Sequence, residues 1–140
     1  RHKSTVTALT GALLRQFRYD GTYNRLTEIE NAFGKITYLN RSSGILTDIT
    51  SPYGQVTTVT VTGNLITSVE NPANEEFVLS YKTGTSLLES ITKPGSQVTT
   101  FTYDGNGRLT GENGNGPNSW ALSQNLTSSG QPVTLTSAEG

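Results

Sequence analysis

The sequence contains no cysteine and one histidine, His2. Without cysteine there is no disulfide scaffold, no thiolate ligand for zinc and no cysteine nucleophile. One histidine near the first residue, where chains often fray, is too little for a catalytic triad or a metal site built on imidazoles. We therefore expect no enzyme activity, no catalytic residues, no metal and no cofactor.

The sequence is also poor in charged and apolar residues, which make up 15% and 32% of it. No apolar run approaches the ~18 residues of a membrane-spanning helix, so no membrane span is expected. No basic cluster with interleaved aromatic residues is present, so nucleic acid is not an expected partner. Instead the chain holds 23 Thr, 14 Ser and 15 Gly. This composition is typical of half-buried strands and tight turns.

A period of about 20 residues runs through the sequence. In most units an apolar anchor is followed, three positions later, by a second apolar residue. The anchors are Leu26, Leu46, Ile66, Leu88 and Leu109, with spacings of 20, 20, 22 and 21 residues. Between them, β-branched and aromatic residues mostly alternate with polar ones. The pattern predicts an all-β fold, a repetitive, open-ended antiparallel sheet of about six two-stranded units of ~20 residues each.

The repeat also defines the expected domain organisation. Residues 1–110 should form the repeat array, residues 111–119 an exposed Gly/Asn-rich loop, and residues 120–140 a final partial repeat. The recurring apolar residues should share one face and form the core, so that Leu46→Ala costs about 2–5 kcal/mol. This predicted core comprises Leu26, Ile29, Leu46, Ile49, Ile66, Val69, Leu88, Ile91, Leu109 and Leu135.

Glycines recur at the turns of the repeat. We assign structural roles to Gly34, Gly54, Gly107 and Gly130. Asn106-Gly107 is expected to form a type I′ hairpin turn, because both residue types accept positive φ angles.

Two Tyr-Asp pairs precede turns of this kind. Tyr19 and Tyr103 are expected to pack across strands. Asp20 and Asp104 are expected to cap the adjoining turns through side-chain hydrogen bonds.

One segment, residues 103–110 (YDGNGRLT), resembles the signature of the YD-repeat, or rearrangement-hotspot (RHS), family. Residues 17–27 look like a second copy with one additional turn residue, and residues 51–54 (SPYG) resemble the family's Pro-x-Gly turn. Other units depart from the signature. Tyr38-Leu39 and Tyr81-Lys82 stand in place of Tyr-Asp, and the pair is missing near Val61.

The resemblance implies an extended β-sheet that spirals into a hollow shell, as in bacterial secreted toxins, toxin-complex cocoons and the extracellular parts of teneurins. Such shells enclose a polypeptide or act as rigid spacers, and their repeat residues serve structure. An extracellular or cell-surface location is therefore implied. The family's autoprotease core, with its paired aspartates, has no recognisable counterpart in this sequence.

Charge is unevenly distributed along the chain. Residues 1–41 hold seven basic and three acidic residues, and residues 42–140 hold three basic and eight acidic ones, giving +4 and −5. We interpret the chain as a non-enzymatic extracellular β-repeat scaffold. It is expected to self-associate head to tail, through edge-strand pairing, into a larger assembly or filament. The candidate contact residues are Arg15, Arg18 and Arg25 on one side and Glu112 and Glu139 on the other.

Two other functions stay open. The chain is alternatively a fragment of an RHS or toxin-complex shell, continued by flanking repeats, that encloses a toxin. The other alternative is a carbohydrate-binding surface module that uses exposed Tyr, Trp120 and Asn side chains. Glu75-Glu76 is a poor acid pair, because neighbours in a strand face opposite ways. The glycosylation sequons at Asn40 and Asn125 are expected by chance in a sequence so rich in Asn, Ser and Thr.

Overall fold

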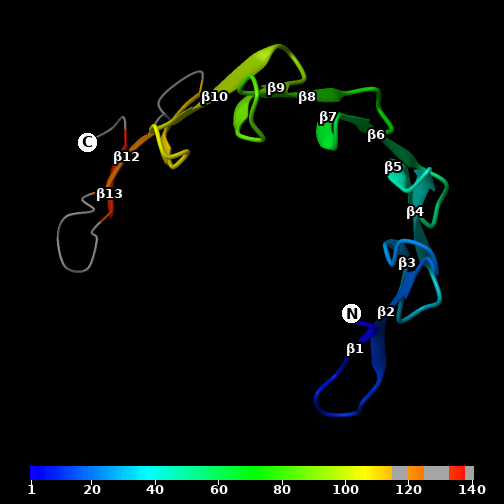
Figure 1. Ribbon diagram of the computed structural model, residues 1–140. Helices are drawn as coiled ribbons and strands as arrows, with labels where there is room; N and C mark the ends of the chain where they lie inside the picture. Colours follow the sequence, from blue (N-terminus) through cyan, green and yellow to red (C-terminus); the bar gives the residue numbers. More distant parts are fainter. Residues whose placement is uncertain (115–119, 125–132, 138–140) are drawn as a thin grey trace. The chain divides into compact units, whose positions relative to one another are not determined.

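The computed structural model describes residues 1–114, 120–124 and 133–137, and Figure 1 shows its strands along the chain. Regular secondary structure in this described part is entirely β-strand, which confirms the all-β prediction. In chain order the strands are β1 (Ser4–Val6), β2 (Leu13–Tyr19), β3 (Leu26–Asn31), β4 (Ile36–Ser42), β5 (Ile45–Thr50), β6 (Val56–Thr62), β7 (Leu65–Glu70), β8 (Glu76–Tyr81), β9 (Leu88–Lys93), β10 (Gln97–Tyr103), β11 (Leu109–Asn113), β12 (Trp120–Gln124) and β13 (Val133–Ser137).

The chain divides into two compact units, Arg1–Glu75 and Glu76–Gly140. The first contains β1 to β7 and the second β8 to β13, in sheet order equal to chain order. Within each unit, every strand pairs antiparallel with its neighbours in sequence. Strand contacts between the described residues of a unit are confined to these ladder neighbours. Each unit is therefore a single-layered β-meander, and its antiparallel arrangement confirms the repetitive sheet that the sequence pattern predicted.

A β-bulge explains the three-residue spacing of the apolar pairs. Residues three apart in a regular strand face opposite ways. In the β2–β3 hairpin, Tyr19 lies opposite Leu26 and Phe17 lies opposite Ile29, so Thr27 is an extra residue. Opposed residues share a face of the sheet. The bulge therefore puts Leu26 and Ile29 on the same face as both aromatic residues.

The same bulge recurs in the hairpins β4–β5, β6–β7, β8–β9 and β10–β11. Its extra residues are Thr47, Thr67, Glu89 and Thr110. In each unit the opposed pairs link the predicted core residues into rows on one face, which we call the apolar face. The other side, called the polar face, carries residues such as Arg18, Glu28, Tyr38 and Asp48.

The predicted core residues are less buried than expected. In the described part of the chain, Val59, at 7% exposure, is the only buried apolar side chain, whereas Ile66 and Leu135 are 40% and 64% exposed. The reason is that no second layer covers the apolar face within a unit. Leu46 is half-buried. The loss expected for Leu46→Ala therefore falls to about 1 kcal/mol, below the range predicted from a closed core.

The loop expected over residues 111–119 starts later than predicted. Strand β11 continues to Asn113, and Gly111 lies opposite both Thr102 and Ala121. A Cβ on Gly111 would lie 3.0 Å from Thr102 Oγ1 and 3.3 Å from the Trp120 carbonyl oxygen. The lack of a side chain at this position thus reflects close packing against both neighbouring strands. Residues 115–119 lie outside the described residues.

Candidate functional site

The residues that carry the repeat signature lie where consecutive strands turn. Asp104 closes the turn between β10 and β11. Its Oδ1 accepts hydrogen bonds from the backbone N–H groups of Asn106 and Arg108, both at 2.9 Å. The N–H of Gly107 donates to the Asp104 carbonyl at 3.0 Å, and Gly107 has a φ of +78°. The carboxylate thus caps this turn.

The type I′ turn expected at Asn106-Gly107 is wrong, because only Gly107 of the two has a positive φ. The Asp104 carboxylate holds the Asn106 amide inside a three-residue loop, which is a type I turn followed by one left-handed residue.

Asp20 plays the same part in the longer turn between β2 and β3. Its Oδ1 accepts from the N–H groups of Thr22, at 3.0 Å, and of Tyr23, and its Oδ2 accepts from that of Arg25 at 2.9 Å. Asn24 takes the left-handed position, with a φ of +58°. The additional turn residue is therefore accommodated because both carboxylate oxygens are used.

These amide hydrogen bonds lower the pKa of both turn carboxyl groups. For Asp20 the main cause is the amide of Tyr23, and for Asp104 it is the amide of Arg108. Partial desolvation opposes the shift in each case. Since the charged form accepts these bonds best, the caps are complete when the carboxyl groups are ionised.

The same hydrogen-bond pattern recurs at the other end of the hairpins, in the turns Asn31–Lys35, Ser51–Gln55 and Asn71–Glu75. In each turn, an oxygen of the first side chain accepts from the amides two and four residues later. Gly34 and Gly54 take the left-handed position, with φ of +72° and +81°. Gly130 lies outside the described residues.

The two signature tyrosines connect their strands to the backbone of the segment that precedes them in the sheet. The Tyr103 hydroxyl donates to the carbonyl of Leu88 at 2.7 Å, and the Tyr19 hydroxyl donates to the carbonyl of His2 at 2.7 Å. The β9–β10 ladder has its last pair at Ser90 and Thr100. The Tyr103 hydroxyl therefore holds the strands together beyond the point where their backbone pairing stops, and we call this bond the tyrosine staple.

In the β4–β5 hairpin, Arg41 occupies the position that the tyrosine has in β2–β3 and β10–β11. It lies opposite the anchor Leu46, just as Tyr19 lies opposite Leu26. Its Nε and Nη2 atoms are 3.4 Å from the carbonyl oxygen of Leu26, so the guanidinium supplies the same kind of staple. Tyr38 faces the opposite way, opposite Thr50. The prediction that Tyr38-Leu39 takes the place of Tyr-Asp is therefore wrong by three residues.

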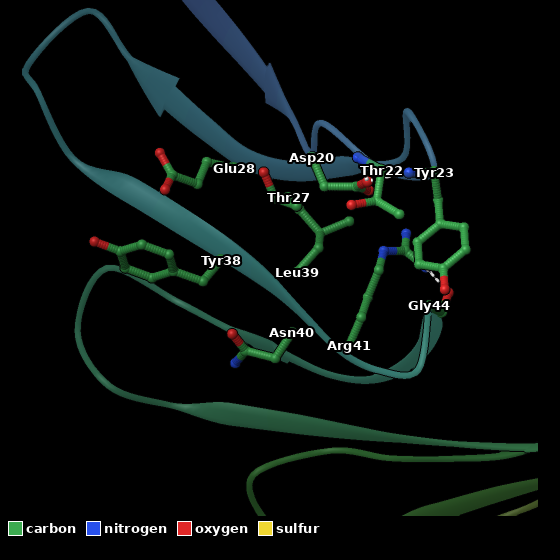
Figure 2. A pocket seen from close by; sticks show the side chains of 10 residues that line it. All are labelled: Asp20, Thr22, Tyr23, Thr27, Glu28, Tyr38, Leu39, Asn40, Arg41 and Gly44. Atoms are coloured by element: carbon green, nitrogen blue, oxygen red, sulfur yellow. Dashed lines mark hydrogen bonds between the residues drawn. The ribbon is translucent and has the colours of Figure 1, made fainter.

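A shallow groove of about 410 Å³ opens where β3 and β4 separate, beyond Glu28 and Tyr38, the last residues that these strands pair. Figure 2 shows Arg41 extending through this groove toward Tyr23. Sequence reasoning missed Arg41. Its distance of 22 residues from Tyr19, which equals the distance between Tyr81 and Tyr103, was the available signal.

Sequence reasoning also missed the bulge threonines. The hydroxyls of Thr27 and Thr47 each donate at 3.2 Å to a carbonyl on the opposing strand, of Arg18 and Asn40 respectively. Thr67 makes the equivalent bond to Thr60 at 3.4 Å. The bulge interrupts the ladder, and the hydroxyl supplies a donor for a carbonyl at that point. The signal was present, since a Thr directly follows four of the five anchors, Leu26, Leu46, Ile66 and Leu109.

Comparison with known protein families shows to which family the chain belongs. A family model described as the teneurin YD-shell matches residues 1–139. The chain belongs to the teneurin YD-shell family. This confirms the resemblance to YD repeats, and it places the chain among structural shell domains that are generally extracellular or at the cell surface and not typically enzymatic. No curated protein matches the chain.

The charged residues proposed for self-association have different surroundings in this YD-shell chain. Arg18 is held on the polar face by Glu28, at 2.8 Å, and by Glu30. The Arg25 guanidinium lies over the Tyr23 ring, 5.1 Å from its centroid. The structure thus does not gather the three arginines into one free basic patch, because Arg18 is neutralised within its own hairpin.

The remaining residues of that proposal are Arg15, Glu112 and Glu139. Arg15 is exposed, and the half-buried Glu112 lies opposite Phe101 and Trp120. Glu139 lies outside the described residues.

The described part of the YD-shell chain contains no group of three or more His, Asp or Glu residues suited to a metal ion. It also contains no helix that is long and apolar enough to span a membrane. Glu75 belongs to a turn, where its carboxylate accepts a hydrogen bond from Asn71 Nδ2 at 2.6 Å. At the first sequon, Asn40 Nδ2 donates to Asp48 at 2.5 Å, and the second sequon residue, Asn125, lies outside the described residues.

Proposed function

We propose that this chain is a wall segment of an extracellular β-shell, a non-enzymatic structural element whose sheet continues through its edge strands. The observation that supports this most is the single-layered meander, in which each strand of a unit is extended sideways by the next. Among the described strands, β1 and β13 each have a neighbour on one side only, β2 and β12 respectively. Open edges of this kind offer backbone N–H and C=O groups to another strand.

The two faces of the sheet support a wall rather than a globular core. Within each unit the apolar face stays half-exposed, while the polar face of unit 1 carries the ion pairs of Arg18. A single layer with two chemically different faces suits a wall that separates an interior from the surroundings. A globular domain would instead cover its apolar face with a second layer.

The strand that continues the sheet comes either from flanking repeats of the same polypeptide or from another copy of the chain. In the second case, β1 of one copy pairs head to tail with β13 of the next. Such a contact joins two different surfaces, so it builds rings or filaments rather than closed two-fold dimers. Arg15, Arg25 and Glu112 remain candidates for steering this encounter. Enclosure of a toxin stays a prediction of the family resemblance.

Edge pairing is tested by blocking β1. The Phe17 N–H donates to the Lys3 carbonyl at 2.8 Å, so Lys3 faces β2 and the backbone of Ser4 faces the open edge. Ser4→Pro removes the outward N–H group, and Ser4→Ala is the matched control that keeps it. Sedimentation of the 140-residue chain over a range of concentrations should show growing assemblies for the wild type and the control, and monomers for the proline variant.

Low salt should speed the encounter of two chains through their exposed charges. It should not be needed to keep the assembled material together. A wild-type chain that stays monomeric at high concentration and low salt would exclude the head-to-tail assembly. The flanking repeats of a longer polypeptide would then be the source of the continuing strands.

A further inference from the structure

Two arginines without an acidic partner lie at one end of the groove between β3 and β4. Ion pairs in the described part of the chain involve Arg18 and Arg108, so the charges of Arg25 and Arg41 are unpaired there. Both guanidiniums lie beside Gly44. Arg25 Nη1 is 2.7 Å from the place that a Gly44 Cβ would take, and Arg41 Nη1 is 3.5 Å from the Gly44 carbonyl oxygen. Two like charges gathered at one residue favour an anion between them.

Both guanidiniums also keep hydrogen-bond donors for a ligand. A guanidinium has five N–H groups. Arg41 directs three of its nitrogen atoms at the carbonyl oxygens of Leu26 and Gly44, at distances of 3.4 and 3.5 Å, which leaves N–H groups to spare. The Arg25 guanidinium donates no hydrogen bond to the described part of the chain, and it is held over the Tyr23 ring at 5.1 Å from the centroid. This cation–π contact positions the group without using its donors.

The acidic residues that line the groove do not compete for these donors. Asp20 accepts hydrogen bonds from the backbone N–H groups of its own turn, among them those of Thr22 and Arg25. Glu28 is paired with Arg18 at 2.8 Å. Because the oxygens of both carboxylates are engaged within the β2–β3 hairpin, the donors at Gly44 stay available to an external anion.

The groove is larger than a bare inorganic anion needs. Its volume of about 410 Å³ is that of a site for a small organic molecule. Figure 2 shows Leu39 and Thr27 between the charged end of the groove, at Arg41, and its other end, at Tyr38. A ligand that fills this space places its anion at Arg41 and an apolar stem over Leu39.

The charge and the donor geometry select the class of anion. A phosphate monoester carries a charge of about −1.5 to −2 at neutral pH, which matches two guanidiniums. The parallel N–H groups of a guanidinium bond two oxygens of such a group at once. A sulfate monoester has the same tetrahedral shape and a single negative charge.

We propose that this groove binds the tetrahedral oxyanion of a phosphate or sulfate monoester. The oxyanion lies between Arg25 and Arg41, and the apolar stem of the ester lies over Leu39. The site is independent of edge-strand pairing, since it is built by the β2–β3 and β4–β5 hairpins inside unit 1.

Calorimetric titration of the 140-residue chain with phenyl phosphate, phenyl sulfate and the two inorganic anions tests the proposal. The better of the two esters should bind at least about fivefold more tightly than its inorganic anion, because the stem adds apolar contact. Arg25→Gln and Arg41→Gln should each weaken ester binding by between about five- and fiftyfold, since each removes a charge-assisted pair of donors. Arg15→Gln is the control, because it removes the same charge from an exposed residue outside the groove and should leave the affinity unchanged.

Stability is kept apart from binding by Arg25→Gln. Arg41→Gln also removes the bonds to the Leu26 carbonyl, whereas the Arg25 guanidinium makes no such bond. Arg25→Gln should therefore melt at the wild-type temperature while it binds the ester more weakly. Tighter binding of phenyl phosphate would identify a phosphate ester as the ligand, and tighter binding of phenyl sulfate a sulfate ester.

Three results would overturn the proposal. The first is the absence of binding to both esters. The second is an inorganic anion that binds as tightly as its phenyl ester, since the groove would then contribute nothing. The third is an equal loss of affinity in Arg25→Gln and Arg15→Gln, which would show that the anion is attracted by net charge alone.

Discussion

Hairpins of two kinds occur in this chain, although they share the same bulge. The β10–β11 hairpin keeps Tyr103 and Asp104 and closes with a turn in which the carboxylate binds backbone amides. The β6–β7 hairpin has Val61 at the tyrosine position and closes with Gly63-Asn64, whose φ angles are +58° and +70°. Both residues are left-handed, as a two-residue type I′ turn requires. The aspartate is thus absent from the short turn, and it is not obligatory in a long one, since Lys82 stands at its position in the β8–β9 turn, where the Lys82 N–H donates to the Leu87 carbonyl.

The comparison of hairpins also separates the structural role of the tyrosine from that of the aspartate. The hairpin β4–β5 has a two-residue turn, Ser43-Gly44, and no aspartate, but it retains a staple because Arg41 donates to the Leu26 carbonyl. Val61 has no donor to offer. The Tyr-Asp signature therefore combines two independent devices, a turn cap and a bond between consecutive hairpins, and each is replaceable alone.

The largest expected effect on the free energy of unfolding comes from a substitution in a two-residue turn. Gly44 has a φ of +81°, and a Cβ there would lie 2.7 Å from Arg25 Nη1 and 3.3 Å from Tyr23 Cδ2. Gly44→Ala should destabilise the chain by about 1–3 kcal/mol, because a left-handed alanine is strained and crowded. Gly63→Asn is the control, since Asn tolerates this conformation and nothing lies within 4 Å of a Cβ at Gly63. Urea denaturation measures both, and equal losses would contradict the argument.

Loss of a tyrosine staple should have the next largest effect. Tyr103→Phe removes the hydroxyl that donates to the Leu88 carbonyl and should cost about 1 kcal/mol of unfolding free energy. Tyr38→Phe is matched in chemistry, and its hydroxyl has no hydrogen-bond partner among the described residues, so it should change stability little. If both variants unfold at the same urea concentration, the staple contributes nothing to stability.

Restoring a staple where it is missing should give a smaller gain. Val61→Tyr places a hydroxyl at the position from which Arg41 and Tyr103 reach the anchor carbonyl of the preceding repeat, here that of Leu46. We expect a gain of about 0.5 kcal/mol. Val61→Phe fills the same space without a donor and serves as the control. A melting temperature for Val61→Tyr that does not exceed that of Val61→Phe would show that the hydroxyl does not reach its acceptor.

The turn cap should have the smallest effect at neutral pH and a distinct dependence on pH. The pKa of Asp104 is lowered in the folded state, so its stabilising contribution is present above the unfolded pKa of about 3.9 and disappears as pH falls through the folded value. Asp104→Asn keeps an oxygen acceptor, as Asn31 does in the equivalent turn. The variant should fold normally at pH 7 and lose less stability than the wild type between pH 5 and pH 2. Thermal unfolding across this range measures the difference, and parallel curves for the two proteins would refute the role of the charge.

The sequence by itself determined the repeat, the all-β class and the family. Period and alternation are local properties, so the anchors Leu26, Leu46 and Ile66 mark the repeat without a structure. The Asx caps of Asp20 and Asp104 were also readable, because a carboxylate bonds amides only a few residues away. The hydrophobic pairs at a spacing of three were visible, but the reason for them was not.

Only the tertiary structure decided register, turn type and depth of burial. The bulge at Thr27 appears when two strands are paired, and it alone places Leu26 and Ile29 on one face. The same pairing shows that Arg41, and not Tyr38, replaces the signature tyrosine. Burial depends on whether a second layer covers the face, and the single layer of each unit leaves Ile66 40% exposed. These properties belong to pairs of strands and to layers. The spacing of 22 residues from Tyr19 points to Arg41, but register and burial are fixed only when the strands pair.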